Sequence, residues 1–197
     1  MAWMGNQSSS RQTLKDFESI RLLGKGAFGK VWLVKHLETG ELYAMKILDK
    51  EAVIQQDLIE HTLLERDVML KCNNPFIINM HCSFQTITSL YFILDYIPGG
   101  SLWSYLCGLP DTCLSEKNTR FYAAEIILGV EELHDKKVVY RDLKPENILI
   151  CKDGHIVLTD FGLSHNLRSS NQKVHSFSGT AIYISPEVLL EQGHDQV

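Results

Sequence analysis

The sequence predicts an α+β fold in which a β-rich first half is followed by a more helical second half. Short runs of β-branched and aromatic residues between polar or glycine-rich turns predict strands at 17–23, 31–34, 42–48 and 90–97. Apolar residues at helical spacing predict helices over 57–72 and 121–133. A length of 197 residues with 45% hydrophobic residues is enough for a sizeable core in one or two domains.

The composition also limits the partners and the compartment. A formal charge of -5 gives no reason to expect nucleic acid or a lipid bilayer as a partner. No apolar run approaches the roughly 20 residues of a membrane span, and residues 1–16 lack the apolar core of a signal peptide. The five cysteines form no C-x-x-C pair, so we expect reduced thiols in a cytoplasmic or nuclear protein.

The first 15 residues are rich in serine and glutamine, and we expect a disordered tail. Met4-Gly5 followed by Ser9 fits the pattern for N-myristoylation only if Met4 were the initiator. Because the chain begins at Met1, we favour a polar tail over a lipid anchor.

A glycine-rich segment separates the first two predicted strands. Gly24, Gly26 and Gly29 form a G-x-G-x-x-G pattern, whose backbone N–H groups can approach phosphate closely. The same pattern occurs in dinucleotide-binding proteins, and it can also be an ordinary turn. The dinucleotide interpretation requires a helix directly after the glycines, whereas a strand is predicted at 31–34. We therefore favour a phosphate-binding loop between two strands.

A buried ion pair is expected between the next strand and the first long helix. Lys46 lies in the apolar strand 42–48, where a lysine at the edge of a sheet is the alternative interpretation. Glu65 is the charged member of a row that faces inward, formed by Leu58, Thr62, Glu65 and Met69. Because a buried carboxylate needs a partner, we expect Glu65 to pair with Lys46.

Helix 121–133 is apolar on almost every side, which predicts that it is buried. We also expect that the remaining segments are too short to cover its large aliphatic side chains, which are Ile126, Ile127, Leu128 and Val130.

Two polar segments follow, each at the end of a short predicted strand. The first is 140–147, with Asp142, Lys144 and Asn147, and the second is 160–162, which begins with Asp160. Strand-like runs at 138–139, 148–150 and 156–158 flank them. Two carboxylates at the ends of neighbouring strands are well suited to hold a metal and a nucleophile together.

These motifs, in this order over residues 16–187, resemble those of protein kinases. Segment 140–147 is similar to H-R-D-L-x-x-x-N with Tyr140 in the histidine position, segment 160–162 is D-F-G, and 185–187 stands where kinases have A-P-E. Asp16-Phe17, Tyr140 to Asp142 and the Ser-Phe-x-Gly-Thr pattern at 176–180 resemble the AGC serine/threonine kinases most. Within that group the chain looks most like the N-terminal kinase domain of mitogen- and stress-activated kinases.

The resemblance implies a bilobal, protein-kinase-like fold. The N-lobe would span about 16–96, the hinge 97–100, and an incomplete helical C-lobe 101–197. Helices that kinases carry after the position of Glu187 are not in the sequence, so we expect a C-terminally truncated domain that is an inefficient kinase by itself.

The resemblance also implies an ATP-dependent serine/threonine kinase that uses Mg²⁺. Asp142 would accept the proton of the substrate hydroxyl, Lys144 would steady the γ-phosphate, and Asn147 and Asp160 would hold magnesium. Lys46, positioned by Glu65, would hold the α- and β-phosphates. The residues expected to hold the nucleotide are Leu23, Gly24, Lys25, Gly26, Ala27, Phe28, Gly29, Val31, Ala44, Lys46, Leu94, Asp95, Ile97 and Leu149.

The expected partners are protein substrates and an upstream kinase that phosphorylates Ser176, with Ser178 as the alternative site. A phosphate on Ser176 would pair with Arg141, helped by His61 and His165. Ser101 stands where many AGC kinases have a glutamate, and a hydroxyl cannot form a charge-assisted pair with arginine. The preference of those kinases for basic substrates is therefore not expected to carry over in full.

Two other functions stay open at this point. One is an inactive regulatory isoform that binds nucleotide or partner proteins, which the expected truncation favours. Against it, Lys46, Asp142 and Asp160 are all present. The other is an NAD-binding protein, which the position of the glycine loop between two strands disfavours.

Overall fold

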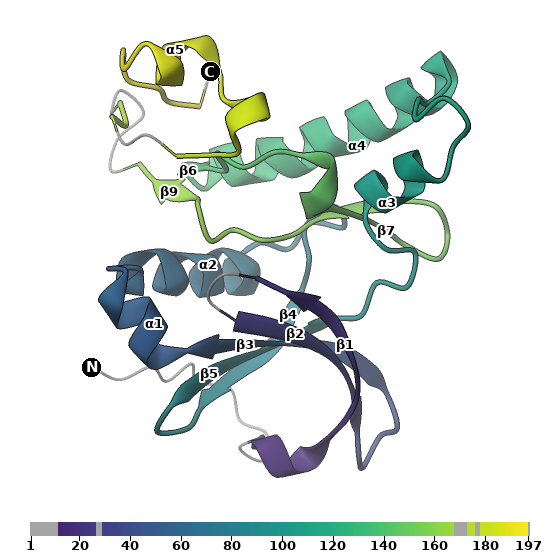
Figure 1. The fold of residues 1–197 in the computed structure, drawn as a ribbon, viewed down its shortest axis with the longest axis vertical. Coiled ribbons are helices and arrows are strands. Elements are labelled where there is room, and N and C mark those ends of the chain that lie inside the picture. The colour runs from purple at the N-terminus through teal and green to yellow at the C-terminus, as the bar shows by residue number, and fades with distance from the viewer. Residues whose placement is uncertain (1–11, 27–28, 168–172, 176–177, 197) are drawn as a thin grey trace. The chain divides into compact units, whose positions relative to one another are not determined.

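The computed structural model describes residues 12–26, 29–167, 173–175 and 178–196. They form two compact units, one from the described parts of Met1–Thr62 and Asn79–Tyr96, the other from those of Leu63–Ile78 and Ile97–Val197. The first unit is mainly sheet, and the second contains most of the helix, as Figure 1 shows. The predicted α+β class is confirmed.

A five-stranded antiparallel sheet forms the first unit, in the order β1-β2-β3-β5-β4. Its strands are β1 (Phe17–Lys25), β2 (Gly29–His36), β3 (Leu42–Asp49), β4 (Met80–Gln85) and β5 (Ser89–Asp95). The strands predicted from the sequence are therefore confirmed, with small differences at their ends. Two irregularities in the pairing of β1 with β2 shift its register, so the side chains of β1 do not alternate strictly between the two faces.

A hydrophobic cluster that includes stacked aromatic rings packs on one face of this sheet. Its buried members are Phe17, Val34, Met45, Tyr91 and Ile93. The rings of Phe17 and Phe84 stack with centroids 6.1 Å apart, and those of Phe84 and Tyr91 with centroids 5.0 Å apart. The short 3-10 helix η1 (Leu14–Asp16) leads into β1, and the backbone N–H of Leu37 donates to the carbonyl of Asp16. The sheet thus gains from aromatic stacking in addition to apolar burial.

Two helices follow β3, where the sequence predicted one. The unpredicted helix α1 (Lys50–Gln55) begins at Asp49, whose carboxylate accepts a hydrogen bond from the backbone N–H of Ala52 at 3.0 Å. Asp57, with φ of 55°, separates α1 from α2 (Ile59–Lys71). The predicted inward row of α2 is confirmed for Thr62, Glu65 and Met69, which are buried.

The second unit combines helices with two small strand pairs. Its helices are α3 (Leu102–Cys107), α4 (Glu116–Asp135) and α5 (Pro186–Leu189), with the 3-10 helices η2 (Pro145–Asn147) and η3 (Ala181–Tyr183). Its strands pair as β6 (Val138–Val139) with β9 (His165–Asn166), and as β7 (Ile148–Ile150) with β8 (Ile156–Leu158). Residues 76–78 form no strand of their own, and Ile77 makes only an isolated bridge with Leu158.

The prediction that helix 121–133 is buried on almost every side is wrong. Only Glu125, Gly129 and Leu133 of α4 are buried, and they form a single stripe with a spacing of four residues. Ile127 is 65% exposed and Leu128 is 46% exposed. The expectation that these two side chains lack cover is therefore confirmed, whereas Ile126 and Val130 are half-buried.

Among the described residues, no helix combines the length and the apolar character needed to span a bilayer. All five cysteines lie in this part of the chain, and no disulfide joins any of them.

Gly29 should be essential to the sheet, because a Cβ atom at this position would lie 2.0 Å from the carbonyl oxygen of Ile47. We expect Gly29→Ala to lower the free energy of unfolding by about 1–3 kcal/mol, as overpacking does elsewhere. Chemical denaturation followed by circular dichroism measures it. Gly24→Ala is the matched control, because no atom lies within 4 Å of a Cβ placed there. Equal stability of the two variants would contradict the argument.

Candidate active site

The loop between β6 and β7 positions the candidate catalytic residues. It leaves β6 at Tyr140, and Arg141 adopts a left-handed backbone conformation with φ of 67°. Pro145 then begins η2, where its missing N–H costs nothing, and η2 runs directly into β7. The loop is thus held at both ends by short strands, which fixes Asp142, Lys144 and Asn147 between them.

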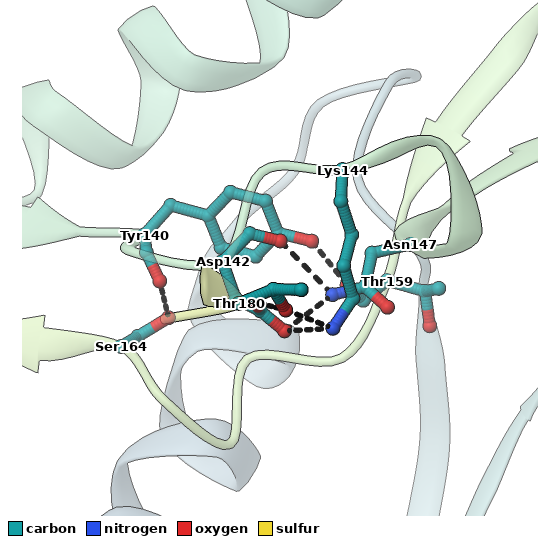
Figure 2. Close-up of polar contacts among 7 residues, drawn as sticks. All are labelled: Tyr140, Asp142, Lys144, Asn147, Thr159, Ser164 and Thr180. Carbon is teal, nitrogen blue, oxygen red and sulfur yellow. Dashed lines mark hydrogen bonds and ion pairs between the residues drawn. The ribbon is translucent and has the colours of Figure 1, made fainter. Parts of the chain in front are cut away.

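The carboxylate of Asp142 is the centre of a hydrogen-bond network (Figure 2). The hydroxyl of Thr180 donates to Oδ1 at 2.7 Å, and the Asn147 side chain donates from Nδ2 to Oδ2 at 2.9 Å. Lys144 Nζ lies 2.8 Å from Oδ2 and also donates to the Thr180 hydroxyl at 2.7 Å. Only 6% of Asp142 is exposed, so these donors replace the water that a buried carboxylate loses.

Asn147 and Asp160 are connected through the backbone. Asn147 Nδ2 donates to the carbonyl of Asp142 at 3.0 Å as well, so the amide nitrogen faces the loop. The carbonyl of Asn147 accepts the N–H of Thr159 at 3.0 Å, and Asp160 follows directly with φ of 59°. Carboxylate and amide oxygens are donors that suit Mg²⁺. Within the described ranges, no group of three or more His, Cys, Asp or Glu residues could hold a metal. Magnesium is usually bound through one or two carboxylates together with substrate phosphates, and the ligand types of Asn147 and Asp160 fit that mode.

Tyr140 ties the two polar segments together. Its phenol donates to the carbonyl of Thr159 at 2.5 Å, and its ring lies 5.3 Å from that of Phe161 (Figure 2 shows the bond). Burial raises the pKa of Tyr140 well above its usual value, and the nearby carboxylates of Asp160 and Asp142 act in the same direction. The phenol therefore stays protonated and remains a donor throughout the physiological pH range.

Arg141 and Ser164 hold the start of the segment that follows Phe161. Arg141 Nε donates to the carbonyl of Leu163 at 2.6 Å, and the buried Ser164 hydroxyl donates to the carbonyl of Tyr140 at 3.4 Å. Burial lowers the pKa of Arg141 from its usual value. Further along, Val174 and His194 exchange two backbone hydrogen bonds of 2.7 and 2.9 Å.

The predicted phosphorylation site Ser176 lies outside the described residues. The alternative, Ser178, is described, and its hydroxyl is buried without a hydrogen-bond partner among the described residues. The same holds for Nδ1 of His61, in the first unit. His165 is the first residue of β9.

In the first unit, the glycine-rich segment joins β1 to β2. Ala27 and Phe28 lie outside the described residues, and the N–H of Gly26 donates to the carbonyl of Gly29 at 3.0 Å. A Cβ on Gly24 or Gly26 would meet no atom within 4 Å, so space is open beside both. Leu23 and Lys25 lie at the end of β1, before that open space.

Other predicted nucleotide residues of the first unit are neighbours in the sheet. Val31 of β2 pairs with Lys46 of β3, and Ala44 of β3 pairs with Leu94 of β5. Asp95 ends β5, and its N–H donates to the carbonyl of Asn79 at 3.1 Å. Leu149 and Ile97 belong to the second unit, Leu149 in the middle of β7.

Comparison with known proteins agrees with these motifs. The family profile described as "Protein kinase domain" matches residues 17–197. The chain belongs to the protein kinase family. It is 47% identical over 189 residues to a RAC family serine/threonine-protein kinase homolog of Dictyostelium discoideum. The aligned region covers 95% of this chain and 42% of that protein. It is 44% identical over 194 residues to serine/threonine-protein kinase Sgk1 of Homo sapiens, covering 98% of this chain and 44% of that protein.

These relatives place the kinase domain with the AGC serine/threonine kinases, as predicted. The chain spans less than half the length of each of these curated relatives. The closer resemblance to mitogen- and stress-activated kinases stays a prediction.

Glu65 of this kinase domain is buried in the second unit, with 3% of the residue exposed. Its Oε2 lies 3.9 Å from the position that a Cβ on Gly162 would occupy, so it is next to the Asp160–Gly162 segment. The ion pair between Glu65 and Lys46 stays a prediction.

Two contacts in the kinase site were not foreseen from the sequence. Thr180 bonds directly to Asp142 and Lys144, although it is far from both in the chain. Tyr140 bonds to Thr159, which lies 19 residues further along the chain. Neither residue has a spacing or composition signal for these bonds, since both depend on how the chain returns to the loop.

Tyr140→Phe should destabilise the kinase domain while preserving the shape of the ring. The variant leaves the carbonyl of Thr159 without its donor, and an unpaired buried polar group costs about 1–3 kcal/mol. Equilibrium unfolding in urea measures the loss. Tyr105→Phe is the control and should change stability little, because Tyr105 is 41% exposed. A Tyr140→Phe protein as stable as the parent would show that the bond contributes nothing.

Proposed function

We propose that this kinase domain transfers the γ-phosphate of ATP to serine or threonine hydroxyls of protein substrates. The observation that carries the proposal is the buried carboxylate of Asp142, held by Thr180, Asn147 and Lys144. Phosphoryl transfer needs little covalent work from the protein, and positioning together with charge neutralisation supplies most of the catalysis. A fixed carboxylate beside a lysine fits that requirement.

In this proposal Asp142 orients the substrate hydroxyl and accepts its proton as the phosphoryl group transfers. Thr180 and Asn147 donate to different oxygens of Asp142, so the carboxylate cannot rotate without losing hydrogen bonds. Lys144 carries the positive charge that steadies the γ-phosphate, and its contact with Asp142 keeps the ammonium in place.

Asn147 and Asp160 would hold Mg²⁺ through side-chain oxygens. When bound, the ion neutralises charge on the phosphate oxygens of the nucleotide. The contribution of the chain is to orient these two groups. The bond of Asn147 Nδ2 to Asp142 directs the amide, and the bond of Thr159 to Asn147 positions the residue before Asp160.

The residues expected to hold the nucleotide keep their predicted roles, and each unit is taken by itself. In the first unit these are Lys46 and the glycine-rich segment, where the open space at Gly24 and Gly26 would admit phosphate groups to the backbone. In the second unit Leu149 would pack on the adenine. Glu65 would position Lys46.

The proposed substrates are intracellular proteins with serine or threonine acceptors, in the cytoplasm or the nucleus. The relatives named serine/threonine kinases support the choice of acceptor. Neither nucleic acid nor a membrane is proposed as a partner, since the net charge of -5 gives no reason to expect either.

A second candidate function is that of a regulatory isoform that binds nucleotide or partner proteins with weak catalysis or none. Exposed apolar side chains in the second unit favour it, among them Ile127 at 65%, Ile182 at 80% and Leu190 at 64%. Apolar groups on a protein surface can bind partner proteins. Comparing peptide phosphorylation by residues 1–197 with that by a version extended with a complete kinase C-terminal lobe separates the two functions.

Asp160→Asn tests the proposed reaction. In the extended version, losing one anionic magnesium ligand should lower the rate of peptide phosphorylation at least about 100-fold, which corresponds to about 2.7 kcal/mol of activation free energy. The unfolding midpoint should change little. Transfer of radiolabelled phosphate from ATP to a serine peptide measures the rate. The exposed Asp111→Asn is the matched control. Normal turnover by a correctly folded Asp160→Asn protein would refute the metal role.

Ser176→Ala tests the proposed activation by an upstream kinase. A phosphoserine adds roughly 1.5–2 negative charges that can pair with Arg141 and order the segment. Mass spectrometry of the active protein should therefore find phosphate on Ser176, and the alanine variant should lose most of its activity. Ser178→Ala is the parallel variant, and it should retain activity if Ser176 is the site. Full activity of Ser176→Ala would overturn the assignment.

A further inference from the structure

The buried stripe of α4 contains a carboxylate where a hydrophobic residue would be usual. Glu125 is 6% exposed, and its neighbours on the stripe are Gly129 and Leu133. A Cβ on Gly129 would lie 3.0 Å from Leu158 Cδ1, so α4 packs closely on β8 at this point. A buried charge in such a place is costly unless partners compensate it.

Both carboxylate oxygens of Glu125 form hydrogen bonds at the start of β8, one to Ile156 and one to His155, the residue before the strand. Oε2 accepts the backbone N–H of Ile156 at 3.0 Å, and Oε1 lies 2.5 Å from His155 Nδ1. Because a carboxylate only accepts, Nδ1 of His155 must carry the proton and donate. The ring of Phe121, one turn earlier on α4, lies 5.6 Å from the imidazole. The side chain of Glu125 therefore clamps the end of the hairpin turn to α4.

The clamped hairpin carries the predicted adenine contact on its first strand. Leu149 of β7 pairs with Val157 of β8, and the turn is closed by a bond from Cys151 N–H to the carbonyl of His155 at 2.7 Å. Ile150 exchanges backbone bonds with the hinge, to Gly99 at 3.1 Å and to Gly100 at 2.9 Å. The position of the hairpin thus sets the position of Leu149 and of the hinge segment beside it.

The second strand of the hairpin leads to the predicted magnesium ligand. β8 ends at Leu158, Thr159 bonds to the carbonyl of Asn147, and Asp160 follows. At about 3.3 Å per residue, Asp160 lies within roughly 13 Å of chain from Ile156. A shift of β8 along or away from α4 would therefore move Asp160 relative to Asn147.

We propose that Glu125 and His155 are positioning residues, which hold hairpin β7–β8 against α4 and thereby place Leu149 and Asp160 for nucleotide and magnesium. Neither touches the reacting atoms. The inference rests on the proposed function, since the positions of Leu149 and Asp160 matter to catalysis only in a protein that handles magnesium nucleotide.

The charge on His155 should make this clamp sensitive to pH. The hydrogen bond to Glu125 raises the pKa of His155. The negative charges of Glu125 and of Asp153, in the same turn, raise it further. Tyr122 of α4 also lies near Glu125, and burial raises the pKa of its phenol, so Tyr122 stays neutral. Protonated His155 gives Glu125 a counter-ion, whereas neutral His155 leaves it only neutral donors. The stabilisation is complete below the ordinary histidine pKa of about 6.5 and is lost as the pH rises through the raised value.

Amide hydrogen exchange at Ile156 tests the clamp without any ligand. In the parent protein, the protection factor of the Ile156 amide, corrected for intrinsic exchange, should fall about fivefold between pH 6 and pH 8.5, the scale of a charge-assisted bond becoming neutral. In His155→Asn, which can donate but not ionise, the fall should disappear. His134→Asn is the control, because His134 lies on α4 and has no side-chain bond to the hairpin among the described residues. This variant should keep the fall in protection with pH.

Adenosine affinity is the second readout, because adenosine has no group that titrates in this pH range. Its dissociation constant should rise by a similar factor, about fivefold, as the pH rises in the parent, and stay flat in His155→Asn. A purely structural clamp would lower the unfolding midpoint without changing the affinity of the folded protein. The measurement is made by titration calorimetry well below the melting temperature.

The outcomes distinguish the two proposals. An Ile156 protection factor with the same pH slope in the parent and in His155→Asn would overturn the clamp. The expected exchange behaviour with a pH-independent adenosine affinity would overturn the positioning role. Expected exchange together with no binding of adenosine at any pH would support the clamp and count against the proposed kinase function itself.

Discussion

The candidate site depends on one buried carboxylate. Asp142 has almost no access to water, and its oxygens are satisfied by side chains from three places in the sequence. Each donor is itself held: Lys144 by Thr180, Asn147 by the backbone of Asp142, and Thr180 by its position before η3. A charge buried in this way is costly if any donor is lost, so the loop, the segment at Thr180 and the start of η2 have to be correct together.

Close backbone approaches explain how short strands can hold such a site. A Cβ on Gly99 would lie 2.3 Å from the carbonyl of Ile150, which is why the hinge can bond to β7. Gly129 similarly lets α4 lie against β8. In both places glycine permits a contact that any larger side chain would prevent, and each contact fixes one side of hairpin β7–β8.

The same hairpin links the chemistry to the helix behind it. Glu125 provides the polar end of this link, and Gly129 and Leu133 provide the packed remainder. The stripe combines a directional bond with tight packing, so α4 sets both the distance and the register of β8. Two of the large side chains that the helix leaves exposed, Ile127 and Leu128, lie outside this stripe and do not contribute to it.

The sequence by itself determined the local elements and the residue types of the site. Alternation and turn residues gave the strands, helical spacing gave the inward row of Glu65, and the order of motifs gave the kinase family, because these signals are carried by neighbouring residues. Only the tertiary structure decided that α4 buries a single stripe, that Thr180 reaches Asp142, and that Glu125 holds His155. The helix α1 could be predicted only in part. Its cap at Asp49 is a local signal, but its six residues are too few to show a helical period. The contacts that the sequence did not predict join residues far apart in the chain, and no local pattern records which distant donor a buried oxygen will meet.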